Sequence, residues 1–229
     1  MEKNVMSELE YIVEARGISR TYQGEVPVYA LKKADIVFRK GEFTAIFGRS
    51  GSGKSTLLRI LATLDVSDTG ELYIEGKNVS ALKDAELAHF RRRRIGFIYQ
   101  DFNLFPEYTA YENIVFPIHL DGREEDRASI EKLMDDLGIL HCRDKFPHEM
   151  SGGEQQRISI ARALATEPAV ILADEPTGNL DAENSQKVAE LLRFCSEEYG
   201  RTVVMVTHDK SMADYADRII SISDGVVTV

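Results

Sequence analysis

Four short runs of almost wholly apolar residues stand out along the chain, each followed by polar residues or glycine. They cover residues 43–47, 95–99, 169–173 and 202–206. Apolar runs of this length predict strands that are buried on both faces, and such strands are typical of a parallel sheet. Segments with apolar residues at helical spacing separate the runs, so the pattern predicts an α/β fold with a mainly parallel sheet.

Shorter strand signals lie outside these runs, next to turn residues. We expect a strand at residues 11–15, a strand pair around a turn at residues 28–38, a hairpin at residues 70–78, and a closing hairpin at residues 218–229. The first three predict an antiparallel β subdomain beside the main sheet. Residues 1–10 are polar, and we expect them to be frayed.

Helices are predicted where apolar residues recur every three or four positions. The predicted helices follow residues 56 and 157 and cover residues 81–94, 113–120, 124–137 and 182–199. The stretch at about 101–157 is mostly helix and loop, with breaks at its prolines. We therefore interpret residues 1–229 as a single domain, with a β-rich core at 1–100 and 158–229 and a helical subdomain inserted at about 101–157.

The segment after the first apolar run fits the phosphate-loop pattern G-x-x-x-x-G-K-[ST]. It consists of Gly48, Arg49, Ser50, Gly51, Ser52, Gly53, Lys54, Ser55 and Thr56. Its glycines let backbone N–H groups approach an anion without a Cβ in the way, and the following helix adds partial positive charge. Lys54 can reach the β- and γ-phosphates, and the Ser55 hydroxyl can hold Mg²⁺. We expect a bound nucleoside triphosphate, because a merely flexible loop would not need these two residues.

Acidic residues follow the apolar run at residues 169–173. Asp174 and Glu175 stand at the carboxyl end of this predicted strand, where α/β folds place ligands. Asp174 is placed to bind Mg²⁺, and Glu175 to orient or deprotonate a water molecule. His208 leaves the sheet at the same edge. A lone histidine there is ordinarily a packing residue, but its position favours a role in the site.

Three further features have both an ordinary interpretation and a functional one. Tyr22, beside a glycine turn, can stack on a base or pack as an ordinary tyrosine. A predicted helix begins with Ser151, Gly152 and Gly153. Its N-terminus can bind a second anion, or Ser151 can be an ordinary N-cap. The arginine run at residues 91–94 is favoured as a solvated face over a nucleic-acid patch.

Composition narrows the classes of function. The chain has 229 residues, 43% of them hydrophobic, and a formal net charge of −10. This is ample for a core, and the acidity argues against a general nucleic-acid binder. Cys142 and Cys195 lack C-x-x-C spacing and are interpreted as ordinary thiols in a reducing cytoplasm. No apolar stretch approaches the roughly 20 residues that span a bilayer, and no secretory signal is apparent. We expect a soluble chain whose membrane role comes through a partner.

Taken together, the motifs resemble those of the ATP-binding cassette family, in the order in which that family has them and over nearly the whole chain. The matching positions are Tyr22, the loop 48–56, Gln100, the signature Ser151-Gly152-Gly153-Glu154-Gln155, Asp174-Glu175, Asp181 and His208. Residues 95–100, 112–113 and 173–181 make the chain look most like the group that serves macrolide exporters, lipoprotein-release complexes and the cell-division ATPase. Met150, where the family usually has Leu, and Arg49, where Pro is common, depart from the pattern without putting ATP binding in doubt.

The resemblance implies a P-loop, RecA-like core and a role for each residue. Tyr22 would stack on adenine, Lys54 and the loop amides would hold the phosphates, and Ser55, Gln100 and Asp174 would surround Mg²⁺. Glu175 would act on the attacking water, and His208 would contact the γ-phosphate. Ser151 and Gly153 would close on the γ-phosphate of ATP held by a second subunit, and Gly152, Glu154 and Asp181 would also belong to the nucleotide-binding residues.

The resemblance also implies partners. A head-to-tail pair of copies would complete both nucleotide sites, and an integral-membrane permease subunit would hold the chain at the cytoplasmic face of the membrane. We expect an ATPase that powers export or extrusion of a lipoprotein, peptide or drug. A non-transport ATPase that transmits force to control envelope remodelling remains an alternative. A DNA-repair or translation cassette is disfavoured, since coiled coils and a second cassette are absent. A metabolite kinase would not explain the signature or His208.

Overall fold

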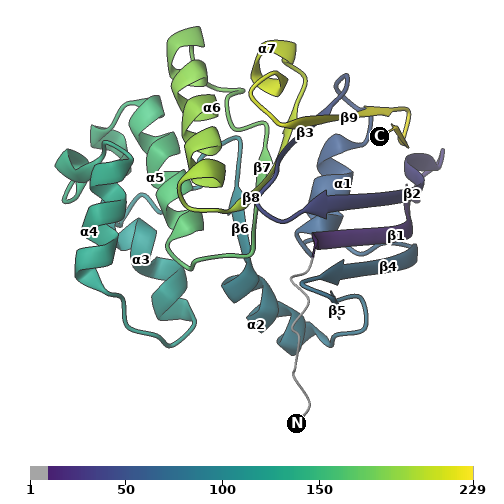
Figure 1. Ribbon diagram of the computed structural model, residues 1–229, viewed down its shortest axis with the longest axis horizontal. Helices are drawn as coiled ribbons and strands as arrows, with labels where there is room; N and C mark the ends of the chain where they lie inside the picture. The colour runs from purple at the N-terminus through teal and green to yellow at the C-terminus, as the bar shows by residue number, and fades with distance from the viewer. Residues whose placement is uncertain (1–9, 229) are drawn as a thin grey trace.

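A computed structural model describes residues 10–228, which form two sheets with helices packed around them (Figure 1). The larger sheet has six strands in the order β10-β9-β3-β8-β7-β6. These strands are β3 (Phe43–Phe47), β6 (Ile95–Ile98), β7 (Val170–Asp174), β8 (Thr202–Thr207), β9 (Arg218–Ser223) and β10 (Val226–Thr228). All neighbours in this sheet are parallel except β9 and β10. The predicted α/β fold with a mainly parallel sheet is confirmed.

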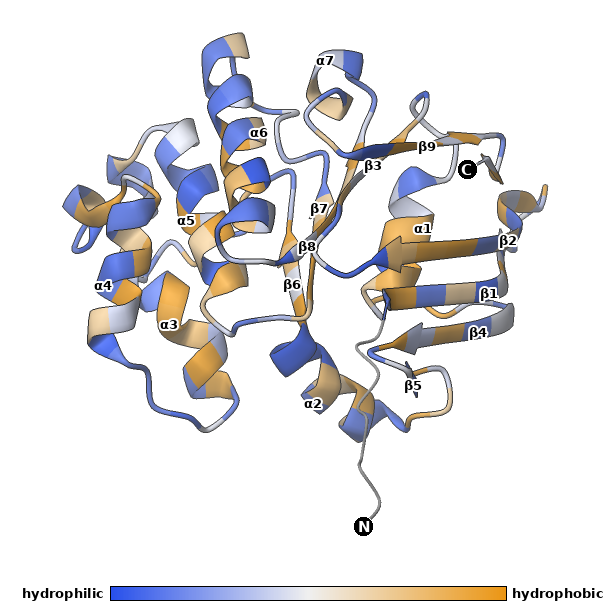
Figure 2. Cartoon of the chain, viewed as in Figure 1, coloured by the Kyte–Doolittle hydropathy of each residue, from blue (hydrophilic) through white to orange (hydrophobic). Residues whose placement is uncertain are grey.

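The central strands β3, β7 and β8 are apolar on both sides because each face packs on a different layer. Residues alternate between two buried clusters. Ala45, Ala173 and Met205 face the first cluster, with the helices that follow β6, whereas Ile46 and Leu172 face the second, with α1 (Lys54–Leu61) and the smaller sheet. In Figure 2, α1 is coloured largely hydrophobic.

The smaller sheet is antiparallel, with the order β2-β1-β4-β5. Its strands are β1 (Tyr11–Tyr22), β2 (Val28–Arg39), β4 (Thr69–Ile74) and β5 (Lys77–Asn78). The expected strand pair at residues 28–38 is wrong, because β2 is one continuous strand. The expected strand at residues 11–15 is too short: Gly17, at φ +61, forms an irregularity in the register with β2. Such a bulge bends a strand without ending it, so β1 reaches Tyr22.

Seven α-helices occur among the described residues. They are α1, α2 (Asp84–Arg94), α3 (Ala110–Leu120), α4 (Arg127–Asp136), α5 (Gly152–Leu164), α6 (Ala182–Glu197) and α7 (Lys210–Ala213), together with the 3₁₀ turns η1 (Leu140–Cys142) and η2 (Pro147–Glu149). In Figure 1, α3, α4 and α5 stand together at one side of the larger sheet, away from the smaller sheet.

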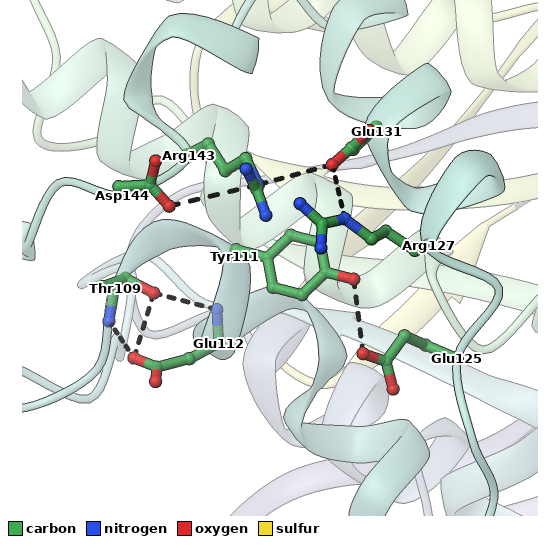
Figure 3. Close-up of polar contacts among 8 residues, drawn as sticks. All are labelled: Thr109, Tyr111, Glu112, Glu125, Arg127, Glu131, Arg143 and Asp144. Carbon is green, nitrogen blue, oxygen red and sulfur yellow. Dashed lines mark hydrogen bonds and ion pairs between the residues drawn. The ribbon is translucent and has the colours of Figure 1, made fainter.

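Some helix boundaries differ from the predicted ones for local reasons. The helix after the phosphate loop ends at Leu61 and leaves out Leu64, because Thr63 has a positive φ of 56°. α3 begins at Ala110 rather than at residue 113, since the Thr109 hydroxyl accepts a hydrogen bond from the Glu112 backbone N–H and the Glu112 carboxylate accepts one from Thr109 N–H. Figure 3 shows this reciprocal cap, which satisfies two donors that a helix start leaves free.

The remaining expectations from the sequence concern the arginine run, the two cysteines, membrane-spanning segments and the N-terminal residues. No residue of α2 is buried, and its arginines contact neighbouring groups: Arg93 pairs with Asp121 at 2.6 Å, and Arg94 pairs with Glu75. Cys142 and Cys195 are both free and buried, and burial raises the pKa of Cys142 to about 11 and that of Cys195 to about 12. Among the described residues, no helix is both long and apolar enough to cross a membrane. The expectation for residues 1–10 lies almost wholly outside the described residues.

Candidate functional site

The phosphate loop joins the carboxyl end of β3 to α1 and lines a hollow. Gly51 and Gly53 have φ values of +75° and +104°, which L-residues rarely adopt. A Cβ on Gly53 would collide with the carbonyl oxygen of Ala30, and one on Gly48 with that of Ile222. The outer side of the loop therefore packs against the backbone of β2 and β9. Gly53 is required both by its φ and by this contact, whereas Gly48 is required by the contact alone.

Lys54 is the first residue of α1, and its side chain lies inside the loop. Its side chain is 3% exposed, and its Nζ donates to the carbonyl oxygens of Gly48 at 3.0 Å and Arg49 at 2.9 Å. The ammonium is also 3.7 Å from the Glu175 Oε1. An anion that enters the loop therefore meets a cation already in place.

Ser55 and Asp174 come from different elements and meet beside the loop. Strands β3, β8 and β7 are parallel and in register, so Phe47 pairs with Thr207 while Asp174 pairs with Val206. This alignment brings the carboxyl ends of the strands to one edge, where the Ser55 hydroxyl donates to Asp174 Oδ1 at 2.9 Å. Burial raises the pKa of Asp174, and the neighbouring Glu175 charge raises it further, against the hydrogen bond from Ser55. A nearby cation would favour the ionised carboxylate.

Glu175 and His208 leave adjacent strands and form a pair. The Glu175 Oε2 lies 2.8 Å from the His208 Nδ1. Glu175 has a positive φ of 43°, a backbone conformation that is uncommon outside functional sites and turns. The two side chains also line a second hollow of about 510 Å³ that extends to Thr177 and Ser185. The two oxygens of Glu175 thus connect Lys54 on one side with His208 on the other.

Tyr22 lines the same hollow as the phosphate loop. This hollow has a volume of about 570 Å³, and Lys54, Ser55 and Glu175 also line it. The end of β1 places Tyr22 there. Its ring is 38% exposed, its hydroxyl donates to Asp65 Oδ2 at 2.7 Å, and the guanidinium of Arg20 lies 5.0 Å from its ring centroid.

Sequence reasoning missed the other wall of this hollow. Tyr29, Ala30 and Lys32 from β2, together with Asp224 and Gly225, line it. The Asp-Gly pair was interpreted only as a hairpin turn. In the structure, Gly225 N–H donates to the Ser52 carbonyl at 2.9 Å, so the turn supports the phosphate loop. The sequence showed the turn itself, but Ser52, which the turn contacts, lies more than 170 positions away in the chain.

The signature residues lie elsewhere. Ser151 caps α5: its hydroxyl oxygen accepts the Glu154 backbone N–H at 3.3 Å, and the Glu154 carboxylate accepts the Ser151 N–H at 2.8 Å. Gly153 packs on α6, where a Cβ would come within 2.6 Å of Asn184 Oδ1. No residue from Ser151 to Glu154 is among those that line the hollow at the phosphate loop. Within one chain, therefore, this segment and the loop do not share a cavity.

Gln100 and Asp181 also lie outside that cavity, next to the turn that follows Glu175. Gln100 packs against Gly178, and its carbonyl accepts from Asn179 Nδ2 at 3.2 Å. Asp181 caps α6 by accepting the Asn184 N–H at 2.8 Å. This bond, and the one from the Asn184 side chain, lower the pKa of Asp181. The turn thus connects the end of β7 with the segment after β6.

A phosphate-binding loop at the edge of a mainly parallel sheet, with a buried lysine, an exposed serine and two half-buried carboxylates converging on it, defines a nucleotide-binding protein of the P-loop class.

Comparison with known proteins identifies the family. A model of the ABC transporter family matches residues 31–178. The lipoprotein-releasing system ATP-binding protein LolD of Porphyromonas gingivalis is 44% identical over 218 residues, which cover 94% of this chain and 98% of that protein. The macrolide export ATP-binding/permease protein MacB of Chlorobaculum tepidum is also 44% identical, over 94% of this chain but only 33% of its own length.

A solved structure gives the same result. The dimeric ATP-binding cassette MJ0796, in a post-hydrolysis state with ADP and Pi, superposes with a TM-score of 0.85 and is 42% identical, over 95% of this chain and 97% of that one. The chain therefore belongs to the ABC transporter family, as the ATP-hydrolysing cassette. The resemblance drawn from the sequence motifs is confirmed.

Proposed function

We propose that this chain hydrolyses ATP as a head-to-tail dimer and thereby powers a separate integral-membrane permease that exports or extrudes a lipoprotein, peptide or drug. The observation that carries the proposal is that one chain holds a phosphate loop and a signature segment that line no common cavity. A two-fold pair joins each loop to the partner's signature. The named relatives support the export class, and neither they nor the fold favour the force-transmission or DNA-repair alternatives.

The residues of one chain divide the nucleotide between them. Tyr22 offers a ring face to adenine at the mouth of the hollow. Loop amides and Lys54 hold the phosphates, and Lys54 exchanges its bonds to the Gly48 and Arg49 carbonyls for phosphate oxygens. Such an exchange keeps the buried ammonium hydrogen-bonded throughout, which avoids the cost of an unpaired buried charge.

Mg²⁺ suits the donors beside the loop. Ser55 and Asp174 supply oxygen ligands that already lie in contact, and Mg²⁺ prefers oxygen ligands together with substrate phosphates. The raised pKa of Asp174 fits a carboxylate whose charge a cation is meant to balance. Ser55, Gln100 and Asp174 would hold the ion, which supplies charge neutralisation at the phosphates.

Glu175 is the proposed base for the attacking water. His208 holds one oxygen of its carboxylate and leaves the other directed to the loop, 3.7 Å from Lys54. His208 is proposed to contact the γ-phosphate when ATP is bound. Ser151 and Gly153 are proposed to close on the γ-phosphate of ATP held by the partner, and Gly152, Glu154 and Asp181 are proposed nucleotide-binding residues. The permease would hold the dimer at the cytoplasmic face of the membrane.

Glu175→Gln tests this assignment, because glutamine keeps the shape of the side chain and removes the base. We expect steady-state hydrolysis to fall by about 10²–10⁴-fold, the usual effect of losing a positioned base, while ATP binding stays intact and an ATP-bound dimer accumulates on size exclusion. Glu183→Gln is the matched control, since Glu183 is an exposed acid on α6. Unchanged hydrolysis in Glu175→Gln would exclude Glu175 as the base, and a monomer in ATP would exclude the dimer.

A further inference from the structure

Three side chains with metal-ligating atoms meet between η1 and the first turn of α5, and none of them lines the hollow at the phosphate loop. His141 and Cys142 belong to η1, and Glu154 lies in the first turn of α5. His141 Nε2 is 2.9 Å from Glu154 Oε1, and Cys142 Sγ is 3.1 Å from the same oxygen. The three ligand atoms all lie within 4.8 Å of one another.

We propose that His141, Cys142 and Glu154 form a binding site for a divalent cation of the zinc class. A thiolate, an imidazole and a carboxylate are the ligands that Zn²⁺ takes, at bond lengths of about 2.0–2.3 Å. Tetrahedral bonds of that length separate two ligand atoms by about 3–4 Å. The observed spacing is close to this, so small side-chain rotations suffice. The thiol disfavours Mg²⁺ and Ca²⁺, which prefer oxygen.

The segment that carries two of the ligands is held in place by the chain around it. Arg143, next to Cys142, lies with its guanidinium 5.2 Å from the ring centroid of Tyr111, and its Nε is 3.5 Å from Glu131 Oε1. In Figure 3, the Arg143 side chain lies between Asp144 and Glu131. Its carbonyl also accepts the Tyr111 N–H at 3.0 Å. Ligands held in advance lose little freedom when a metal binds.

Glu154 is fixed from its other side. Its Oε2 accepts the N–H and the hydroxyl of Ser151, so Oε1 is the oxygen that faces His141 and Cys142. A metal on Oε1 leaves the cap of α5 intact. It would also link η1 to the signature segment, because the same carboxylate accepts hydrogen bonds from Ser151.

Solvent reaches the cluster through His141. The Cys142 side chain is buried, whereas the His141 side chain is 60% exposed and lines a hollow of about 470 Å³ with Leu140, Lys145 and Glu149. A cation can therefore enter past the imidazole, and a water molecule can serve as the fourth ligand, which three-ligand zinc sites keep open.

The protons balance on binding. In the metal-free chain the thiol keeps its proton and donates a hydrogen bond to Glu154 Oε1. Binding of one Zn²⁺ forms the S–Zn bond, and that thiol proton leaves to solvent. The imidazole coordinates through the Nε2 lone pair, with its proton on Nδ1. One thiolate and one carboxylate then neutralise the two charges of the ion, so no net charge is left at the partly buried site.

Cobalt titration of the untagged, chelator-stripped full chain tests the site directly, because Co²⁺ bound by a thiolate gives a charge-transfer absorption in the near ultraviolet. We expect this band to saturate at one equivalent of Co²⁺ and to disappear when Zn²⁺ is added. Cys142→Ser should abolish the band. His141→Gln should weaken Zn²⁺ affinity, measured against a chromophoric chelator, by more than the roughly 10–100-fold cost of losing an outer-shell partner.

Two controls separate the site from general effects. Cys195→Ala removes the other thiol and should keep the band, and His148→Gln, on the exposed turn η2, should keep the Zn²⁺ affinity. ATP binding by each variant shows that the variant is folded. Because His141 is exposed, the His141→Gln variant tests the site even if Cys142→Ser unfolds. A wild-type chain without the band, a band that survives in Cys142→Ser, or full Zn²⁺ affinity in His141→Gln would overturn the proposal.

Discussion

At the scale of single residues, the tyrosine at the mouth of the nucleotide hollow is held by a carboxylate. Asp65 accepts the Tyr22 hydroxyl at 2.7 Å and its own neighbour Val66 N–H at 2.7 Å, and it pairs with Arg20 at 2.8 Å. Burial alone would raise the pKa of Asp65, but these hydrogen bonds and the Arg20 charge outweigh it, so its pKa is lowered. The ionised carboxylate therefore stabilises the fold around Tyr22.

Asp65→Asn should lower the melting temperature at neutral pH. A carboxyl group whose pKa is lowered by folding contributes stability that is present above its unfolded value, about 3.9, and is lost as the pH falls through the folded value. We therefore expect the gap between wild type and variant to shrink as the pH falls from neutral to acid, measured by thermal melts across that range. Tyr22→Phe, which removes one donor to Asp65 and keeps the ring, should open a smaller gap. A gap that stays constant or widens in acid would contradict the assignment.

At the scale of elements, the segment between β6 and α3 is held in an unusual shape. Phe102 and Asn103 both have positive φ, at 59° and 50°, and Arg162 of α5 donates to both of their carbonyl oxygens, at 2.8 Å and 2.6 Å. Directly after this turn, Phe105 forms an aromatic cluster with Tyr108 and Phe116, with ring centroids 4.7–5.7 Å apart.

This aromatic cluster is partly packed and partly exposed. It packs on α3, yet Phe105 and Tyr108 remain 40% and 38% exposed. Half-exposed aromatic residues suit the centre of an interface, and Gln100, just before this segment, is a proposed Mg²⁺ ligand. We therefore expect the permease to dock over Phe105.

Phe105→Asp should leave ATP binding by the isolated chain nearly unchanged and should prevent its co-purification with the membrane subunit in detergent. An acid placed at the centre of an apolar contact loses its water without gaining a partner. Val26→Asp, an equally apolar-to-acidic change on the exposed turn between β1 and β2, is the control and should co-purify. Full co-purification of Phe105→Asp would exclude this docking role, and loss of ATP binding in the isolated chain would assign Phe105 to folding instead.

At the scale of the whole molecule, the proposed active site exists only between two copies. Lys54 lines one hollow, and Ser151 caps a helix on the other side of the larger sheet, among α3 and α4 (Figure 1). Such an arrangement makes hydrolysis depend on association, and opening of the pair is then available as a mechanical signal to a partner.

Mixing two inactive variants tests this dependence. Lys54→Ala should weaken ATP binding, whereas Ser151→Arg should spare binding and block hydrolysis. In a mixed dimer, one site combines the intact Lys54 of one copy with the intact Ser151 of the other, so an equal mixture should recover at most roughly a quarter of the wild-type sites. ATPase activity of the mixture, with the heterodimer verified by two affinity tags, is the measurement. Verified heterodimers without activity would contradict the exchange of sites across the pair.

The sequence by itself determined the features that depend on local spacing. Lys54 and Ser55 follow a glycine loop at fixed positions, and the carboxylates of Asp174 and Glu175 directly follow an apolar strand, so pattern alone identified the loop and the acids. The apolar runs likewise gave the mainly parallel sheet, because strands buried on both faces leave no polar alternation.

Only the tertiary structure decided what joins distant parts of the chain. The bulge at Gly17, which carries β1 to Tyr22, depends on pairing with β2, and Gly225 reaches the phosphate loop through a contact that no local pattern encodes. The sequence indicated only an ordinary thiol at Cys142, whereas the structure shows that packing of η1 on α5 places this thiol next to Glu154. Side-chain periodicity reports which face of an element is buried, but the partner on that face is chosen by packing of the whole chain.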